Sequence, residues 1–225
     1  MQRAVQRKYP IITCCTFKFA NDNHSQISHL AAMPTPQDLL DLLLSRQSVG
    51  ALEEPAPHGT ELDLILDAGL RAPDHGRLRP WRFVLIRGEA RTTLGECLAE
   101  AVKARDRQAP PAQLDRYRAW ALRTPLLIAV GARIRPGHPV PEIEQMLSAG
   151  AAAMNMLNAI HMLGYGGMWV TGANTYDPRV NAALGFHAPS RLVGFLAVGT
   201  PRTTTPAERP ERLAHVIEWS GPLAA

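Results

Sequence analysis

The sequence predicts an α+β fold in which helices cover a small sheet. Two observations favour this class: segments with helical and strand patterns follow one another without the regular alternation of a βαβ chain, and no internal repeat occurs. Hydrophobic residues form 46% of the 225 residues and charged residues 20%, so the chain can bury a large core and is not a disordered chain. We therefore expect one domain over residues 33–225.

Residues 1–32 differ from the rest of the chain. They hold four basic residues and one acidic residue, which accounts for +3 of the formal net charge of +4, and they show no sustained periodicity. The alternative is a secretory signal, but polar residues interrupt the one apolar run, residues 11–17, that such a signal needs. We expect a flexible extension that lies ahead of a natural start at Met33.

The composition also excludes several classes of protein. Beyond residue 32 the net charge is only +1, which is too little for a nucleic-acid-binding surface. No apolar run approaches the roughly 18 residues of a membrane span. Three cysteines, two of them adjacent, and eight histidines without an i,i+2 or i,i+4 helical pair argue against a disulfide framework and a metal site. We expect a cytoplasmic protein with no metal, no nucleic-acid partner and no membrane partner.

The first ordered segments are two amphipathic helices. Residues 35–48 begin with a threonine cap and a proline at the first helical position, and leucines follow at helical spacing. A proline-rich connection leads to the second helix, residues 60–72, with Thr60 as its cap. Pro73 ends this helix, because the residue before a proline is pushed out of helical geometry.

Two strands and two helical stretches come next. Residues 81–88 and 125–133 are rich in β-branched and aromatic or aliphatic residues, which is typical of strands. The second strand is an almost continuous apolar run, so we expect both of its faces to be buried. Between the strands, residues 91–123 contain two helical stretches separated by a proline-rich break.

A long helix over residues 142–163 dominates the second half of the chain. It is apolar nearly all round, with two asparagines and His161 as its polar interruptions. Such a helix belongs in the centre of a protein or at a subunit interface. Two more strands, residues 167–172 and 191–199, follow it, and a Pro/Thr-rich tail ends the sequence.

Basic and hydroxyl side chains gather at two element ends. Arg46, Gln47 and Ser48 close the first helix, and an arginine and a serine two residues apart can together hold a phosphate. Arg71 and His75 belong to a second basic cluster at the break after the second helix. A purely structural role is the alternative, because cations at a helix C-terminus meet the negative end of the helix dipole.

Seven short motifs occur in a fixed order along the chain. They are R-Q-S (46–48), E-P-A-P (54–57), R-A-P-D-H (71–75), P-W (80–81), E-Q-M-L-S-A-G (144–150), G-G-M-W-V-T-G (166–172) and V-G-F-L-A-V-G-T-P (193–201). In this order and spacing they resemble the flavin-dependent nitroreductase family, in particular its short NAD(P)H nitroreductases of the YdjA type. The resemblance spans residues 37–202.

The resemblance implies a site for FMN and a site for the reductant. For FMN it implies Arg46, Gln47 and Ser48 at the phosphate, Arg71 and His75 across the pocket, and Trp169, Val170 and Thr171 along the isoalloxazine ring. For NADH or NADPH it implies the A-x4-G segment: Ala159, Ile160, His161, Met162, Leu163 and Gly164. No catalytic acid or base is implied, because the flavin itself carries the hydride.

The same resemblance implies the architecture and the activity. The fold would be a small mixed sheet covered by helices, and the protein a homodimer through the long central helix with FMN at the subunit interface. The reaction would be ping-pong, with NAD(P)H as reductant and a nitroaromatic, quinone or similar electron-poor small molecule as acceptor. Two alternatives stay open, since fold does not fix function: a flavin-storage or sensing protein, and a specialised dehydrogenase or flavin-fragmenting enzyme.

Overall fold

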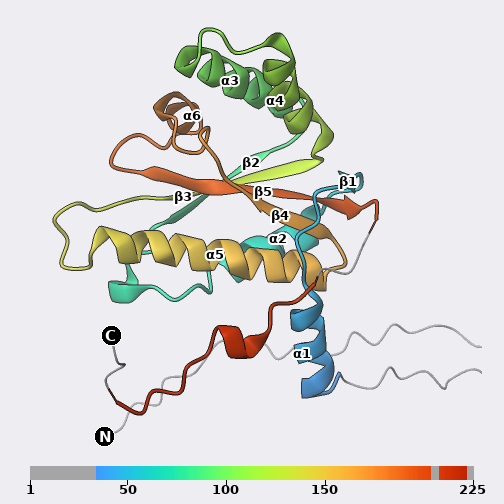
Figure 1. The fold of residues 1–225 in the computed structure, drawn as a ribbon, viewed down its shortest axis with the longest axis vertical. Helices are drawn as coiled ribbons and strands as arrows, with labels where there is room; N and C mark the ends of the chain where they lie inside the picture. The colour runs from blue at the N-terminus through green and yellow to red at the C-terminus, as the bar shows by residue number, and fades with distance from the viewer. Residues whose placement is uncertain (1–33, 204–207, 222–225) are drawn as a thin grey trace, which may run out of the picture. The chain divides into compact units, whose positions relative to one another are not determined.

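The computed structural model describes residues 34–203 and 208–221 (Figure 1). The extension expected over residues 1–32 lies outside the described residues. Pro36–Ala225 form one unit by their internal contacts, and every element named below belongs to it. Within the described ranges, no helix combines the length and the apolar character that a membrane span requires.

Five strands form the sheet at the centre of this unit. They are β1 (Leu52–Glu53), β2 (Trp81–Ile86), β3 (Leu126–Ala132), β4 (Gly166–Val170) and β5 (Arg191–Pro201). β5 is the middle strand, because it pairs with β3 along one edge and with β4 along the other, while its last two residues pair with β1.

The described strand pairs are all antiparallel, so the expectation of a mixed sheet is wrong for this part of the chain. The connection between β2 and β3 illustrates the reason. Two packed helices, rather than one, join these strands, so the chain returns to the end of the sheet at which β2 stopped. A strand that starts there runs antiparallel to its neighbour.

Helices cover both faces of the sheet. The helices are α1 (Pro36–Ser45), α2 (Gly59–Gly69), α3 (Ala90–Arg105), α4 (Pro111–Arg123), α5 (Glu142–Met162) and α6 (Pro178–Ala183). α2 and α5 pack on one face, and α3, α4 and α6 pack on the other (Figure 1). The α+β class is therefore confirmed.

The burial of β3 follows from this sandwich of layers. All seven of its residues are buried. Leu126, Ile128 and Val130 join the core against α2 and α5, whereas Leu127 and Ala129 join the core on the opposite face. The prediction that both faces of this strand are buried is confirmed.

Two helix boundaries differ from the expectation. α1 ends at Ser45, so Arg46 already lies outside the helix. α2 begins at Gly59 with His58 in the N-cap position, instead of using Thr60 as its cap. The amides of Arg71 and Ala72 bond to carbonyls three residues back, which tightens the final turn and ends the helix before Pro73.

β1 and α6 were not expected from the sequence. β1 has two residues and α6 has six, which is too short for a periodic pattern to be detected. α6 nevertheless carries a local signal, because the Asp177 side chain accepts a hydrogen bond from the Arg179 amide and Pro178 occupies the first helical position.

A substitution of Gly131 can test how tightly the sheet packs against the segment after α6. It lies at a register shift of β3, and a methyl group at this position would overlap the buried ring of Phe186. We expect Gly131→Ala to lower the free energy of unfolding by about 1–3 kcal/mol, the usual cost of overpacking a core. Urea denaturation measures this loss. In the Phe186→Leu background the same substitution should cost clearly less, and an equal cost in both backgrounds would contradict the overlap.

Candidate functional site

A cavity of about 490 Å³ lies where the C-terminal ends of α1 and α5 meet. It is lined by residues that follow α1, end α5, begin β4 and belong to the C-terminal segment: Ser45, Arg46, Gln47, Val49, Leu157, His161, Gly164, Tyr165, Gly166, Gly167, Pro201 and Arg209. The volume is within the range of small-molecule sites in proteins. We call it the α1–α5 cavity.

A hydrogen bond between Ser45 and His161 joins the two helix ends. The Ser45 hydroxyl donates to the Leu42 carbonyl at 2.8 Å, which uses its single hydrogen. His161 Nε2 lies 2.8 Å from the same oxygen and must therefore be the donor of that second bond. We assign the Nε2–H form to His161 on this basis, which leaves Nδ1 available to a ligand.

Two arginines, Arg46 and Arg209, line this cavity. The Arg209 Nη2 donates to the Arg46 carbonyl at 3.2 Å, which ties the C-terminal segment to the residue after α1. None of the described residues that line the cavity is Asp or Glu. Two arginines and an amide, with no acid among them, form a donor set that fits a phosphate group.

Tyr165 borders the same cavity and is fixed by Glu61 of α2. Its hydroxyl donates to Glu61 Oε2 at 2.7 Å. This hydrogen bond, together with burial and the charge of Glu61, raises the pKa of Tyr165 above its ordinary value. The phenol therefore stays neutral at physiological pH and adds no negative charge beside the two arginines.

The residues predicted at the phosphate are brought together only in part. Arg46 and Gln47 line the cavity, whereas Ser48 does not and Ser45 is present in its place. Arg209 was missed, because the tail shows no periodicity or motif and only the folded chain brings it beside Arg46.

The second predicted group, Arg71 and His75, lies at the opposite end of α5. His75 Nδ1 lies 2.6 Å from Glu144 Oε2 in the first turn of that helix. The Ser148 hydroxyl donates to the Pro73 carbonyl at 2.6 Å, which fixes the same loop one turn further along. Arg71 and His75 are both exposed.

The loop after this point has a strained backbone that one carboxylate stabilises. Arg77 and Arg79 adopt positive φ values of 55° and 51°, a region that residues other than glycine rarely occupy. Asp74 accepts hydrogen bonds from the amides of Leu78 at 3.1 Å and Arg79 at 2.7 Å. Strain of this kind persists where surrounding bonds fix the backbone, often near binding sites.

A single chain does not bring Arg46 and His75 into one pocket. Arg46 lies beside His161 and His75 beside Glu144, and these two α5 residues are separated by about 25 Å at 1.5 Å of rise per residue. The two predicted halves of the FMN site therefore lie at opposite ends of the same helix.

The three residues predicted along the isoalloxazine ring do not share one surface. Trp169 packs between Gly150 of α5 and Gly194 of β5, and its Nε1 is buried without a hydrogen-bond partner among the described residues. Val170 packs against the core on the other face of the sheet. Thr171 is exposed, just beyond the end of β4.

The segment predicted to meet NAD(P)H is likewise divided. Ile160 is fully buried in the core, and Met162 is 46% exposed. His161 and Gly164 line the α1–α5 cavity together with Arg46. The segment therefore contributes to the cavity only through these two residues.

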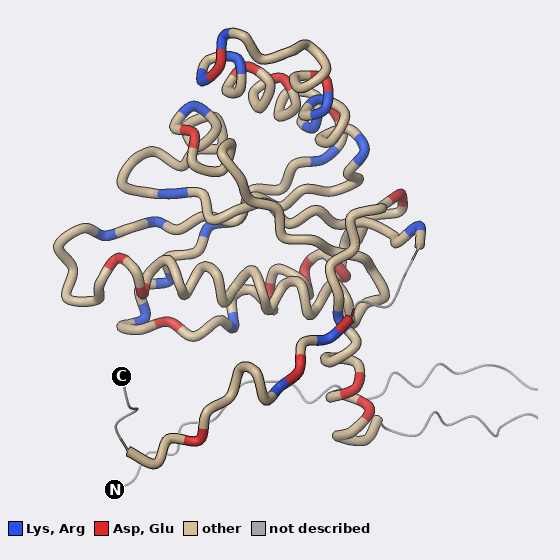
Figure 2. Tube along the Cα trace, viewed as in Figure 1, with Lys and Arg blue, Asp and Glu red and all other residues tan. Residues whose placement is uncertain are grey.

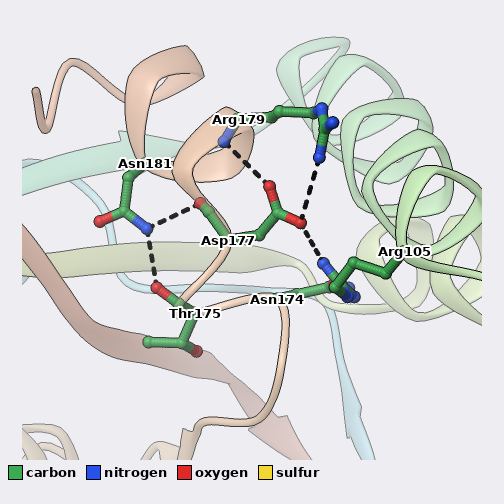
Figure 3. Close-up of polar contacts among 6 residues, drawn as sticks. All are labelled: Arg105, Asn174, Thr175, Asp177, Arg179 and Asn181. Atoms are coloured by element: carbon green, nitrogen blue, oxygen red, sulfur yellow. Dashed lines mark hydrogen bonds and ion pairs between the residues drawn. The ribbon is translucent and has the colours of Figure 1, made fainter.

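Figure 3 shows a buried polar network that fixes the connection between β4 and α6. Arg105 of α3 forms an ion pair with Asp177 and also donates to the Asn174 side chain. The Asp177 side chain is 1% exposed. Asn181 then donates from Nδ2 to the carbonyls of Thr175 and Asp177, at 2.8 and 2.9 Å. These bonds hold the segment that follows Thr171 in one conformation.

Cys97 of α3 lies near this network. Burial, with the charges of Glu100 and Asp177, raises the pKa of its thiol above the ordinary value. The thiol is therefore protonated at neutral pH and is a poor nucleophile.

Comparison with known proteins identifies relatives over most of the chain. The model of the Nitroreductase family matches residues 43–200. The Escherichia coli (strain K12) protein named "Putative NAD(P)H nitroreductase YdjA" is 42% identical over 165 residues, which cover 73% of this chain and 89% of that protein. A Haemophilus influenzae protein named "Putative NAD(P)H nitroreductase" is 34% identical over 182 residues, 80% of this chain and 95% of the relative.

Solved structures share the fold. The nitroreductase-like family protein from Bacillus cereus matches with a TM-score of 0.74 at 22% identity, over 84% of this chain and 100% of its own. A nitroreductase from Desulfovibrio desulfuricans, titled as a complex with FMN, matches with a TM-score of 0.64 at 23% identity, over 84% of this chain and 100% of its own. At these identities the comparison establishes the nitroreductase-like fold.

The network in Figure 3 can be tested by removing either of its two arginines. Arg105→Ala leaves the buried Asp177 carboxylate without its main partner, so we expect a loss of about 3 kcal/mol in the free energy of unfolding. Arg179→Ala is the matched control, because its exposed guanidinium lies 3.8 Å from the same carboxylate and should contribute less than about 1 kcal/mol. Thermal and urea unfolding of both variants measure the difference, and equal losses would contradict the assignment.

Proposed function

This chain belongs to the nitroreductase family, and from that premise we propose that it is an FMN-dependent oxidoreductase. It takes electrons from NADH or NADPH and passes them to a nitroaromatic, a quinone or a similar electron-poor molecule. The observation that carries the proposal is the α1–α5 cavity. Arg46, Arg209 and His161 line it, and none of its described lining residues is acidic. This donor set suits the phosphate of FMN.

The phosphate end of FMN would be held by residues on both sides of the cavity. Arg46 and Arg209 neutralise its charge, and Gln47 lies on the same wall. His161 donates from Nε2 to Ser45, so in this tautomer its Nδ1 can accept a hydrogen bond from a hydroxyl group of the ligand. Because His161 and Gly164 share this cavity with Arg46, the A-x4-G segment would contribute to the FMN site and not to a separate site for NAD(P)H.

The ring end of FMN would be held by Arg71, His75 and Thr171, from a second copy of the chain. α5 has no Lys, Arg, Asp or Glu from Gln145 to Met162, and this stretch is uncharged along its length in Figure 2. Its outer face exposes Ile143, Leu147, Met154 and Met162. An apolar stripe of this length favours burial against another subunit.

Two-fold symmetry would then complete the site. In a two-fold dimer the same patch of each subunit faces its counterpart, and with the symmetry axis perpendicular to α5 the two α5 helices run in opposite directions. The C-terminal end of one α5 then lies near the N-terminal end of the other. Arg46 and Arg209 of one protomer would thus complete a pocket with Arg71 and His75 of its partner.

When bound, FMN supplies the hydride chemistry, and the chain supplies binding and orientation. Arg46 and Arg209 fix the phosphate, and Glu144 orients the imidazole of His75 through its 2.6 Å contact. The ion pair between Arg105 and the buried Asp177 holds the backbone that follows Thr171. No side chain is assigned as a catalytic acid or base.

The activity has a direct test. The purified protein should be yellow, with about one FMN per chain, and anaerobic mixing with NADPH or NADH should bleach the flavin absorbance in a stopped-flow instrument. Bound flavin that neither nucleotide reduces would contradict the enzyme and favour a storage or sensing protein. Protein that binds no FMN would contradict the proposal altogether.

Arg46 is expected to distinguish FMN from riboflavin, which has no phosphate. A hydrogen bond to an anion is worth about 1.5–3 kcal/mol, so Arg46→Ala should weaken FMN binding by about ten- to a hundredfold and leave riboflavin binding nearly unchanged. Arg209→Ala should do the same, whereas Ser48→Ala should cost at most about 1 kcal/mol. Fluorescence titration of apo-protein measures both flavins. Equal losses for FMN and riboflavin would show that Arg46 acts on stability, not on the phosphate.

Mixing two defective variants tests the shared site. Arg46→Ala and His75→Ala homodimers each carry a defect in both of their sites, and both should bind FMN weakly. A heterodimer formed from the two variants pairs one wild-type Arg46 with one wild-type His75, so it regains one intact site. We expect tight FMN binding at about half the wild-type stoichiometry, measured on heterodimers purified with two affinity tags. No recovery in the heterodimer would place both residues in one protomer's site or in none.

A further inference from the structure

A second cavity, of about 520 Å³, lies between α6, the start of β5 and the first half of α5. Its walls are mostly apolar: Met146, Tyr176, Pro178, Ala182, Phe186, Ala188 and Leu192 line it, with Thr175, Asn181, His187, Ser190 and Arg191 as polar members. None of the proposed FMN or NAD(P)H residues lines this cavity. We call it the α6 cavity.

The polar groups of the α6 cavity differ in what they can offer a ligand. Asn181 is fully engaged, because its Nδ2 donates to two carbonyls and its Oδ1 accepts from the Leu192 amide at 2.7 Å. The other lining side chains that carry a donor group are Thr175, Tyr176, His187, Ser190 and Arg191. Arg191 bonds Glu142 through Nη2 at 3.0 Å and keeps its other N–H groups.

One wall of the cavity is rigidly held by the network of Figure 3. Asp177 caps α6 and pairs with Arg105, and Asn181 ties Thr175 to β5. These bonds join three elements that are far apart in the sequence. The wall is therefore built before any ligand arrives, as in most small-molecule sites.

The position of the cavity relates it to the ring end of the proposed FMN site. Met146 lies on α5 between Glu144, which contacts His75, and Ser148, which bonds the Pro73 carbonyl. Thr175 and Tyr176 follow closely on Thr171, at the end of β4. The α6 cavity thus lies toward the N-terminal end of α5, the end that His75 contacts through Glu144.

We propose that the α6 cavity binds the apolar body of the electron acceptor, an inference that rests on the proposed function. The oxygens of a quinone or a nitro group only accept hydrogen bonds, which matches a rim of donors. None of the described residues lining the cavity is acidic, so an electron-rich oxygen meets no repulsion there. The volume accommodates a planar aromatic ring system.

The electron balance of the step is simple. A quinone gains two electrons and two protons and becomes a hydroquinone, as NAD(P)H gives up one hydride and becomes NAD(P)⁺. The hydride accounts for both electrons and one proton, and solvent supplies the second proton. The cavity contributes position, not a chemical group.

Two neighbouring alanines of α6 provide a matched pair of variants. Ala182 and Ala183 are both exposed, but only Ala182 lines the cavity. Ala182→Phe fills the cavity with a ring, and Ala183→Phe adds the same ring outside it. Because both positions are exposed, both variants should fold, and equal melting temperatures would document this.

The measurement compares a quinone with an acceptor that needs no pocket. For FMN-loaded Ala182→Phe we expect the KM for menadione to rise about tenfold or more, with unchanged ferricyanide reduction and unchanged bleaching of the flavin by NADPH. Isothermal titration of menadione into the oxidised protein should show the same loss of affinity. Ala183→Phe should match the wild type throughout.

The two proposals fail separately in this experiment. If Ala182→Phe and Ala183→Phe bind and reduce menadione alike, the α6 cavity is not the acceptor site. If menadione binding is lost in Ala182→Phe but NAD(P)H never reduces the wild-type flavin, the proposed oxidoreductase activity fails and the cavity remains a quinone-binding site.

Discussion

The lack of charge along α5 governs most of this structure. One side of the helix is buried against the sheet through Ala149, Ala153, Met156 and Ile160, so the sheet and α2 are assembled around it. The other side is apolar as well and stays exposed in a single chain. A helix that is apolar on both sides favours burial against a second surface, which in the proposed dimer is its own symmetry mate. The proposed half-sites lie at the two ends of this helix.

Much of the fold could be predicted because its elements carry strong local patterns. The long helix was expected over residues 142–163 and is observed at Glu142–Met162, since twenty residues of one pattern leave little ambiguity. The continuous apolar run of β3 correctly indicated burial on both faces. Two features of the fold were not predicted. β1 and α6 are too short to show a periodic pattern, and the antiparallel pairing depends on how the connecting helices bring the chain back to the sheet.

The candidate site was less predictable, because its residues meet only in the folded chain. Arg46 and Gln47 could be found from a motif at a helix end, but Arg209 comes from a tail with no pattern of its own. Arg105 and Asp177 are 72 residues apart, and neither sequence neighbourhood suggests the other. Trp169 matches a motif, yet its indole packs between two glycines inside the sandwich. A motif identifies which residues a family shares, whereas the direction of each side chain is decided by tertiary packing.

The central position of β5 has a consequence for biosynthesis. This strand, Arg191–Pro201, pairs with β1, β3 and β4, although all three precede it in the chain. During translation the earlier strands leave the ribosome without their common partner, and the edges of β3 and β4 that pair with β5 stay open until this strand has been made. Open strand edges are sites of mispairing and aggregation. The sheet of the nascent chain therefore closes only once β5 has left the ribosome.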